Sequence, residues 1–252
     1  MSDSIRMTYL QHLEELRRRI IVSAIGLVAA WIVCWLFAWD ILDLMKKPAG
    51  NIVLNYMSPM EPFLVRFKLA LFGAILLAMP VILFEILGFA SPALKRKEKS
   101  YTFGIMAMIV VFFAGGVIFG YNVIMPPGIR WLMGVAQQQM NPVMSASSYV
   151  NFVGWFMLGL GVSFETPLFI WALIALGVLT PEQLQKQWRY ALIIILLVAS
   201  VITPDWSPIT MALVAIPMLI LYLLCIILGR ITIARRRRRE KLAAEAEEAA
   251  AA

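Results

Sequence analysis

Three carboxylates stand where their surroundings could give them a chemical role. Glu165 interrupts the apolar stretch GVSFETPLFI, Glu98 stands among lysines and an arginine in ALKRKEKSY, and Glu15 precedes three arginines in HLEELRRR. A carboxylate outside the hydrocarbon can hold the planar guanidinium of an arginine through two charge-assisted hydrogen bonds, which a lysine reproduces poorly. Glu98 is therefore a carboxylate that could hold a guanidinium group, and Glu165 indicates a polar site inside a membrane.

The two basic motifs also have plainer interpretations. Glu14 and Glu15 precede Arg18 and Arg19 by four residues, which is the spacing of ion pairs on a helix surface. HLEELRRR is therefore equally consistent with a solvated amphipathic segment that leads into the first apolar run. Glu98 is likewise consistent with a salt-bridged loop residue, so the residues alone leave both alternatives open.

Glu165 is the most unusual single residue of the sequence. An ionised carboxylate near the centre of a membrane helix costs about 2.5 to 3.5 kcal/mol, so we expect it to face a water-filled cavity or a polar partner. The alternative is a protonated side chain that is hydrogen-bonded to a backbone carbonyl between packed helices. Pro167 frees such a carbonyl one turn back, and Gly154, Gly159 and Gly161 allow close helix packing or a kink.

The sequence offers few candidate residues for catalysis or metal binding. The only histidine, His12, lies in the basic N-terminal segment with no metal-binding or nucleophile spacing around it. Asp40, Asp43 and Asp205 fall near the ends of apolar runs, and both cysteines lie inside such runs, where a disulfide is not expected. No glycine-rich phosphate loop is present. We predict a protein that is not an enzyme and that needs no metal or cofactor.

Composition predicts an integral membrane protein. Hydrophobic residues make up 62% of the 252 residues, and the mean hydropathy is +0.83, far above the values of soluble proteins. The formal net charge of +7 comes from basic residues that flank long apolar runs. They are not interleaved with aromatic residues on one surface, so phospholipid headgroups are expected as neighbours and nucleic acid is not.

Six apolar runs predict an all-α protein with six transmembrane helices. About 20 residues are needed to cross the hydrocarbon core, and residues 20–42, 69–90, 103–124 and 150–178 reach that length. The run at 190–203 has 14 residues, or roughly 21 Å at about 1.5 Å per residue. It forms a short final hairpin with residues 209–228, so we expect short fifth and sixth helices. The first run is too long for a signal-peptide core, which favours a retained helix.

The distribution of basic residues predicts the orientation of the helices. Lysines and arginines gather in four segments that share one side of the membrane, namely residues 6–19, 95–99, 186–189 and 230–241. Such segments lie in the cytoplasm, so both termini are expected there. Residues 43–68 and 125–149 should fold as an outer cap. We expect one transmembrane domain over residues 1–230 and a basic, then alanine- and glutamate-rich tail over residues 231–252.

The two basic motifs belong to a longer series. Together with SFETPL, TPEQLQKQWRY, TPDWSP and AIP, they stand in an order and spacing by which residues 9–230 resemble the TatC family, the multispanning core subunit of the twin-arginine protein translocase. The resemblance implies a glove-like concave bundle in the cytoplasmic (inner) membrane. It implies a receptor for twin-arginine signal peptides of folded cargo, which is exported with energy from the proton-motive force. The residues it assigns to signal-peptide binding are Glu98, Glu15, Phe89, Leu94, Leu16 and Arg17.

The resemblance also implies membrane partners and an oligomeric complex. Glu165 matches an intramembrane glutamate that faces a water-accessible groove, where single-span TatA-like and TatB-like helices dock. Pro48 matches a proline of the outer cap. The chain departs from the family where Met211 and Leu223 replace polar residues of the sixth span, which leaves Thr203 as the polar group expected at the end of the fifth helix.

Two other functions compete with the translocase. A proton-coupled transporter of a small solute would use Glu165 and Glu85 as relay carboxylates, but the sequence lacks paired broken helices and a second buried charge at the same depth. A structural membrane scaffold would explain the apolar runs and would leave the cytoplasmic acids without a role. Solute uptake by the protein alone would favour the transporter, and co-purification with single-span partners would favour the translocase.

Overall fold

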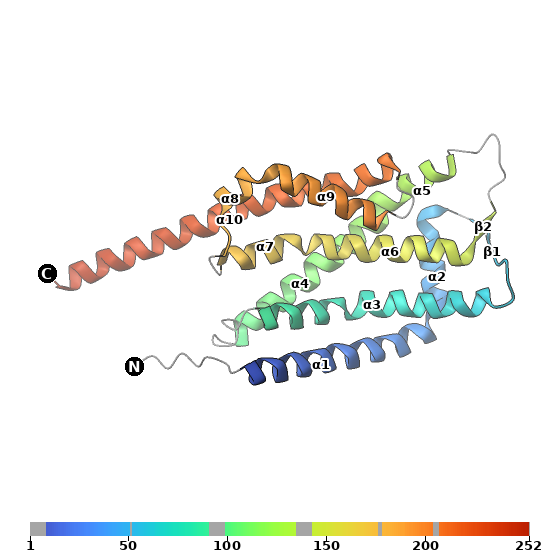
Figure 1. Ribbon diagram of the computed structural model, residues 1–252, viewed down its shortest axis with the longest axis horizontal. Coiled ribbons are helices and arrows are strands. Elements are labelled where there is room, and N and C mark those ends of the chain that lie inside the picture. The colour runs from blue at the N-terminus through green and yellow to red at the C-terminus, as the bar shows by residue number, and fades with distance from the viewer. Residues whose placement is uncertain are drawn as a thin grey trace. The chain divides into compact units, whose positions relative to one another are not determined.

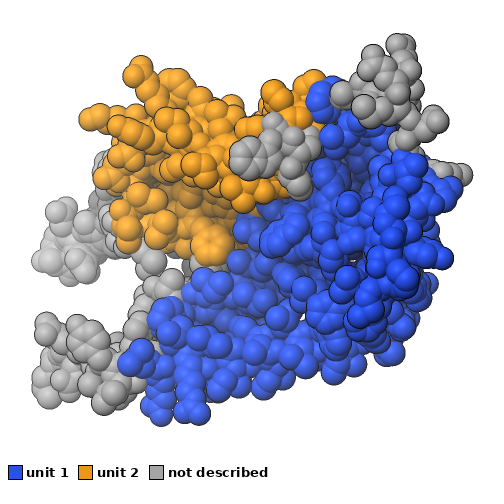
Figure 2. All heavy atoms as spheres, turned by 45° about the vertical axis from the view of Figure 1, so that its right-hand side comes forward, with its two compact units in different colours: residues 1–162 blue, residues 163–252 orange. Residues whose placement is uncertain are grey.

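The computed structural model describes residues 9–50, 52–90, 99–134, 143–175, 178–203 and 207–251, and these form mostly helices (Figure 1). The chain divides into two compact units, Met1–Val162 and Ser163–Ala252, which are blue and orange in Figure 2. Each unit is described by itself below.

The first unit is built around two long helices that lie side by side, α1 and α3 (Figure 1). The chain breaks at Phe37 between α1 and α2, and a five-residue π-helical turn joins α4 to α5. The elements of this part are α1 (Tyr9–Leu36), α2 (Ala38–Lys46), η1 (Lys47–Ala49), β1 (Leu54–Asn55), α3 (Glu61–Ala90), α4 (Lys99–Phe119), η3 (Gly120–Ile124), α5 (Met125–Gly134), β2 (Met144–Ser145) and α6 (Ala146–Phe164).

The second unit packs the long C-terminal helix against three shorter ones. Its elements are α7 (Thr166–Ala175), α8 (Pro181–Lys186), α9 (Trp188–Ile202) and α10 (Pro208–Ala251), and α10 contacts each of the others. Thr180 begins α8 through a capping box, because its hydroxyl accepts from the Gln183 amide while the Gln183 side chain accepts from the Thr180 amide. The Tyr222 hydroxyl on α10 donates to the Leu184 carbonyl at 2.6 Å, which ties α10 to α8.

The predicted pattern of membrane spans is confirmed. By length and composition, five apolar helical stretches of the described residues can cross a membrane, and α9 forms a sixth, shorter apolar helix. The five are Leu13–Leu36, Glu61–Ile86, Met106–Gly134, Ala146–Ile174 and Pro208–Ile231. The chain is therefore a multi-pass, all-α membrane protein with a short fifth helix.

The expectation of a short sixth helix is wrong. Its apolar part, Pro208–Ile231, is 24 residues long and belongs to α10, a helix of 44 residues that continues to Ala251. Alanine, glutamate, arginine and lysine are strong helix formers, and no proline or glycine follows Gly229. The basic and then alanine- and glutamate-rich tail therefore continues the helix.

The outer segments fold together, as expected of a cap. β1 and β2 form a short parallel pair in which Leu54 lies opposite Met144. The buried Glu61 carboxylate at the start of α3 accepts hydrogen bonds from the Ser145 hydroxyl at 2.6 Å, the Ser147 amide at 3.0 Å and the Met57 amide at 2.6 Å. One boundary was misjudged, because residues 125–134 form helix α5 and extend the third span instead of opening the cap.

Small residues let the helices of the first unit approach closely, as the glycines before Glu165 predicted. A Cβ atom at Gly154 would lie 2.4 to 2.6 Å from ring atoms of Phe72, and one at Gly161 would lie 2.6 Å from a ring atom of Phe113. The Phe72 ring is also fixed by an edge contact with Trp155 at 5.8 Å between ring centroids. A ring that is held in this way cannot shift easily.

Gly154→Ala is expected to destabilise the protein by about 1 to 3 kcal/mol, the usual cost of overpacking a core. Thermal unfolding in a fixed detergent measures the effect as a lower Tm. Gly115→Ala is the matched control, because a Cβ at that helical position has no neighbour within 4 Å. Equal unfolding temperatures for the two variants would contradict the close packing of α6 on α3.

Candidate functional site: an acidic end of the α1–α3 groove

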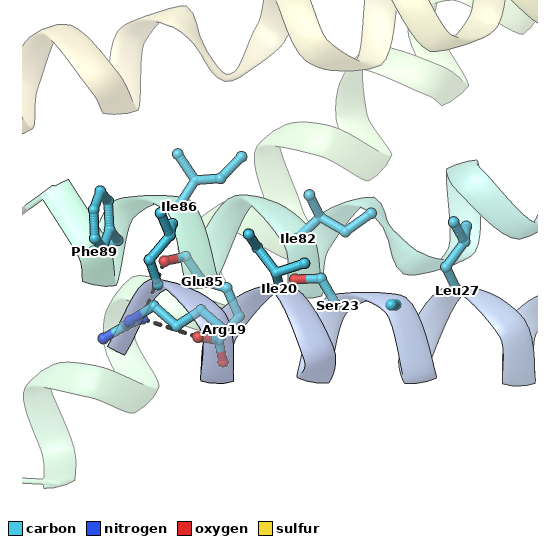
Figure 3. Close-up of a pocket in the computed structure, with 10 residues that line it drawn as sticks. Arg19, Ile20, Ser23, Leu27, Ile82, Glu85, Ile86 and Phe89 are labelled. Atoms are coloured by element: carbon cyan, nitrogen blue, oxygen red, sulfur yellow. Dashed lines mark hydrogen bonds and ion pairs between the residues drawn. The ribbon is translucent and has the colours of Figure 1, made fainter. Parts of the chain in front are cut away.

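A groove of about 360 Å³ lies between the first half of α1 and the last turns of α3. Figure 3 shows Phe89 and Arg19 at one end of this groove and Leu27 at the other. Its wall is apolar except at the end formed by Arg19 and Glu85. The lining residues are Leu16, Arg19, Ile20, Ser23, Ala24, Leu27, Ile82, Glu85, Ile86 and Phe89.

The polar end of the groove is an arginine held between two carboxylates. The Nε and Nη2 atoms of Arg19 donate to Oε1 of Glu15 at 3.0 and 2.8 Å. Its Nη1 atom donates to Oε2 of Glu85 at 2.9 Å, as Figure 3 shows, and to the Glu85 backbone carbonyl at 3.0 Å. The side chains are 14 to 20% exposed. Two carboxylates and one guanidinium leave a formal charge of −1.

Several residues predicted for signal-peptide binding meet here. Leu16 and Phe89 line the groove, and Glu15 is joined to it through Arg19. The expected helix-surface pair of Glu15 and Arg19 is confirmed. Arg17 is exposed on α1 and does not line the groove. Glu98 and Leu94 lie outside the described residues.

Sequence reasoning missed the roles of Arg19 and Glu85 at this end of the groove. The four-residue spacing indicated that Arg19 pairs with Glu15, but it could not show that the same guanidinium reaches α3. Glu85 was considered only as a relay carboxylate of a transporter. Their pairing joins residues that are 66 positions apart, and it depends on the register between α1 and α3, which an apolar pattern does not specify.

Glu165 lies at a break between two helices. α6 ends at Phe164, α7 begins at Thr166, and the Glu165 backbone carbonyl accepts from the amides of Leu168 and Phe169 at 3.0 and 3.1 Å. Pro167 stands in the first turn of α7, where its missing N–H costs little. The Glu165 side chain is 0% exposed. Packing within the chain therefore encloses the carboxyl group, and docking of partner helices at this position stays a prediction.

The other predicted residues occupy separate places. Thr203 ends α9 and is buried, and its hydroxyl donates to the Ala199 carbonyl at 2.8 Å. Met211 is half-buried in the first turn of α10, Leu223 is exposed further along that helix, and Pro48 is half-buried in η1. Within the described ranges no three His, Cys, Asp or Glu side chains come together in a group that could hold a metal ion.

The long apolar helices, the outer cap and the acidic groove end define a multi-spanning membrane protein with a polar site where α1 and α3 meet. Comparison with known proteins identifies its family. A family model described as Sec-independent protein translocase protein (TatC) matches residues 11–217. The chain belongs to the TatC family.

Individual relatives are similar to this protein over most of its length. A Sec-independent protein translocase protein TatC from Koribacter versatilis is 33% identical over 250 residues, which is 96% of this chain and 92% of the relative. The protein of the same name from Aquifex aeolicus is 31% identical over 241 residues, with 93% and 100% covered. A crystal structure of the twin-arginine translocase receptor TatC in DDM matches with a TM-score of 0.78 and 32% identity, over 86% of this chain and 99% of that one.

Proposed function

We propose that this protein is the twin-arginine signal-peptide receptor and core subunit of the Sec-independent translocase, which exports folded proteins across the membrane with the proton-motive force. One observation carries the proposal: Leu16 of HLEELRRR and Phe89, which precedes ALKRKEKSY, line the same groove, and Glu15 is joined to it through Arg19. Membership of the TatC family supports it, as does the likeness to a solved receptor.

The groove matches the general order of charged and apolar segments in a signal peptide. Such a peptide carries a positively charged segment followed by about 7 to 15 apolar residues. The groove has a net negative end at Glu15, Arg19 and Glu85 and an apolar wall that continues to Leu27 and Ile82. A peptide guanidinium at the acidic end would place the apolar segment along the wall. Glu98 would add a second carboxylate for the second arginine.

We propose that the protein lies in the cytoplasmic (inner) membrane with both termini in the cytoplasm, as the basic segments indicate. Single-span TatA-like and TatB-like proteins would dock around Glu165, Thr203 and Met211 in an oligomeric complex. The proton-motive force supplies about 2.3 kcal/mol per charge per 100 mV. The protein itself would bind and conduct cargo without catalysing a reaction.

The proposal is tested by the affinity of a synthetic twin-arginine signal peptide for the protein in lipid nanodiscs. We expect the wild type to bind this peptide at least about tenfold more tightly than its twin-lysine variant, because a lysine loses the bidentate geometry. Glu98→Ala should remove most of that preference. Glu182→Ala is the matched control, since Glu182 is an exposed acid on the same expected side of the membrane.

Equal affinity for the two peptides in the wild type would overturn the receptor assignment. Proton-driven uptake of a small solute by the protein alone in liposomes would then favour the transporter. The sequence comparisons favour the translocase, because the curated relatives described above carry that name.

A further inference from the structure

The acidic end of the groove already holds a guanidinium group, and it belongs to the chain itself. Arg19 makes two hydrogen bonds to Glu15 and two to Glu85. This is the type of contact that the proposed function assigns to an arginine of the signal peptide. A peptide arginine cannot form its own bidentate pair with Oε1 of Glu15 while Arg19 holds that oxygen.

We propose that Arg19 is an internal competitor for the signal-peptide site and sets the affinity that a peptide needs in order to bind there. The inference rests on the proposed receptor function and adds a regulatory contact to it. In the unloaded protein, Arg19 covers the carboxylates of Glu15 and Glu85. A peptide binds by displacing Arg19, so only a group that matches a guanidinium can replace it without loss.

Displacing Arg19 costs every peptide the same free energy, and an arginine recovers more of it than a lysine. When a peptide arginine displaces Arg19, one planar guanidinium replaces another and the bidentate hydrogen bonds are conserved. A lysine ammonium brings a point charge and loses that geometry, so the exchange becomes unfavourable. The displaced Arg19 has a long flexible stem near the start of the first span, and it can carry its charge to the headgroup region.

The alternative role of the ion pair between Arg19 and Glu85 is structural, namely to hold α1 against α3. Other contacts already hold these two helices together. Farther along the two helices, Ala30 packs with Ala74 and Ala78 in a buried cluster that includes Trp31 and Ile82. Trp31 and Trp35 of α1 also make edge contacts with Phe67 and Phe63 of α3, at 5.8 and 6.1 Å between ring centroids. The helices are therefore joined by a long apolar seam, and the charged contact lies at its end.

The test measures Kd for the twin-arginine and twin-lysine peptides with Arg19→Gln, Arg19→Lys and Arg18→Gln in nanodiscs. Arg19→Gln should tighten binding of both peptides by the same factor, at least about fivefold, because each of them no longer has to displace the competitor, and the ratio of the two affinities should stay as in the wild type. Arg19→Lys keeps the charge and removes the planar group, so it is a weaker competitor and should also tighten binding of both peptides. Arg18→Gln removes an equal charge from an exposed neighbour and should leave both affinities close to those of the wild type.

Weaker binding of the twin-arginine peptide to Arg19→Gln, or unchanged affinities in both Arg19 variants, would overturn the competitor role. Arg19→Lys alone decides the question if Arg19→Gln does not fold, as judged by its unfolding temperature. Failure of the receptor function itself looks different, because the wild type would then show no preference between the peptides.

Discussion

Glu15→Gln is expected to lower the affinity of the protein for a twin-arginine signal peptide by about tenfold to a hundredfold. Hydrogen bonds to a charged group contribute about 1.5 to 3 kcal/mol, and the substitution removes the charge while it keeps the size of the side chain. It also weakens the hydrogen bonds from the Nε and Nη2 atoms of Arg19, because a neutral amide oxygen replaces the carboxylate oxygen that accepts them. Peptide titration in nanodiscs measures the loss.

Glu14→Gln serves as the control, since Glu14 is exposed on the same helix turn and its replacement changes the net charge equally. An equal loss of affinity in both variants would show that general attraction between acids and a basic peptide explains the binding. A specific carboxylate site at Glu15 would then be ruled out.

Glu165→Ala is expected to reduce transport of a twin-arginine cargo at least about tenfold while signal-peptide binding stays intact. The enclosed carboxyl group costs about 2.5 to 3.5 kcal/mol if it is ionised near a helix centre, a cost that makes sense if it is recovered when partner helices assemble. Cargo transport into inverted membrane vesicles and peptide affinity are measured on the same preparation.

Glu165→Gln distinguishes the two alternatives that the sequence left open, an ionised carboxylate and a neutral, hydrogen-bonded group. A glutamine keeps hydrogen bonding and cannot ionise, so preserved transport would indicate that a neutral, hydrogen-bonded group is enough. Loss of transport in both variants would indicate that the carboxylate itself is needed. If Glu165→Ala lost peptide binding while it still assembled with its partners, the docking role would be rejected.

The sequence predicted the spans well because hydrocarbon thickness sets the length of an apolar run. It did not predict the break at Glu165, because residues 150–178 formed one apolar run, although Pro167 was expected to free a backbone carbonyl there. The composition of the tail beyond Ile231 did not decide between a helix and a disordered segment. In the structure its helix propensity prevails, and α10 continues to Ala251.

Contacts between remote segments were beyond prediction from the sequence. Glu61 joins the two outer segments through Ser145 and Ser147, and Arg19 joins α1 to Glu85. Both contacts depend on how two elements align, and one residue of register would move each side chain to another face. Short motifs therefore indicated which residues are unusual, whereas the structure was needed to show which of them meet.

The central claim is that a twin-arginine signal peptide binds in the groove between α1 and α3, and site-specific photo-crosslinking tests it most directly. A photoreactive phenylalanine derivative at Phe89, which lines the groove, is compared with one at Val111, which is 68% exposed on α4. We predict that the twin-arginine peptide labels position 89 and not position 111, and that the twin-lysine peptide labels neither. Equal labelling at the two positions, or labelling at position 89 that is the same with both peptides, would contradict binding of the signal peptide in this groove.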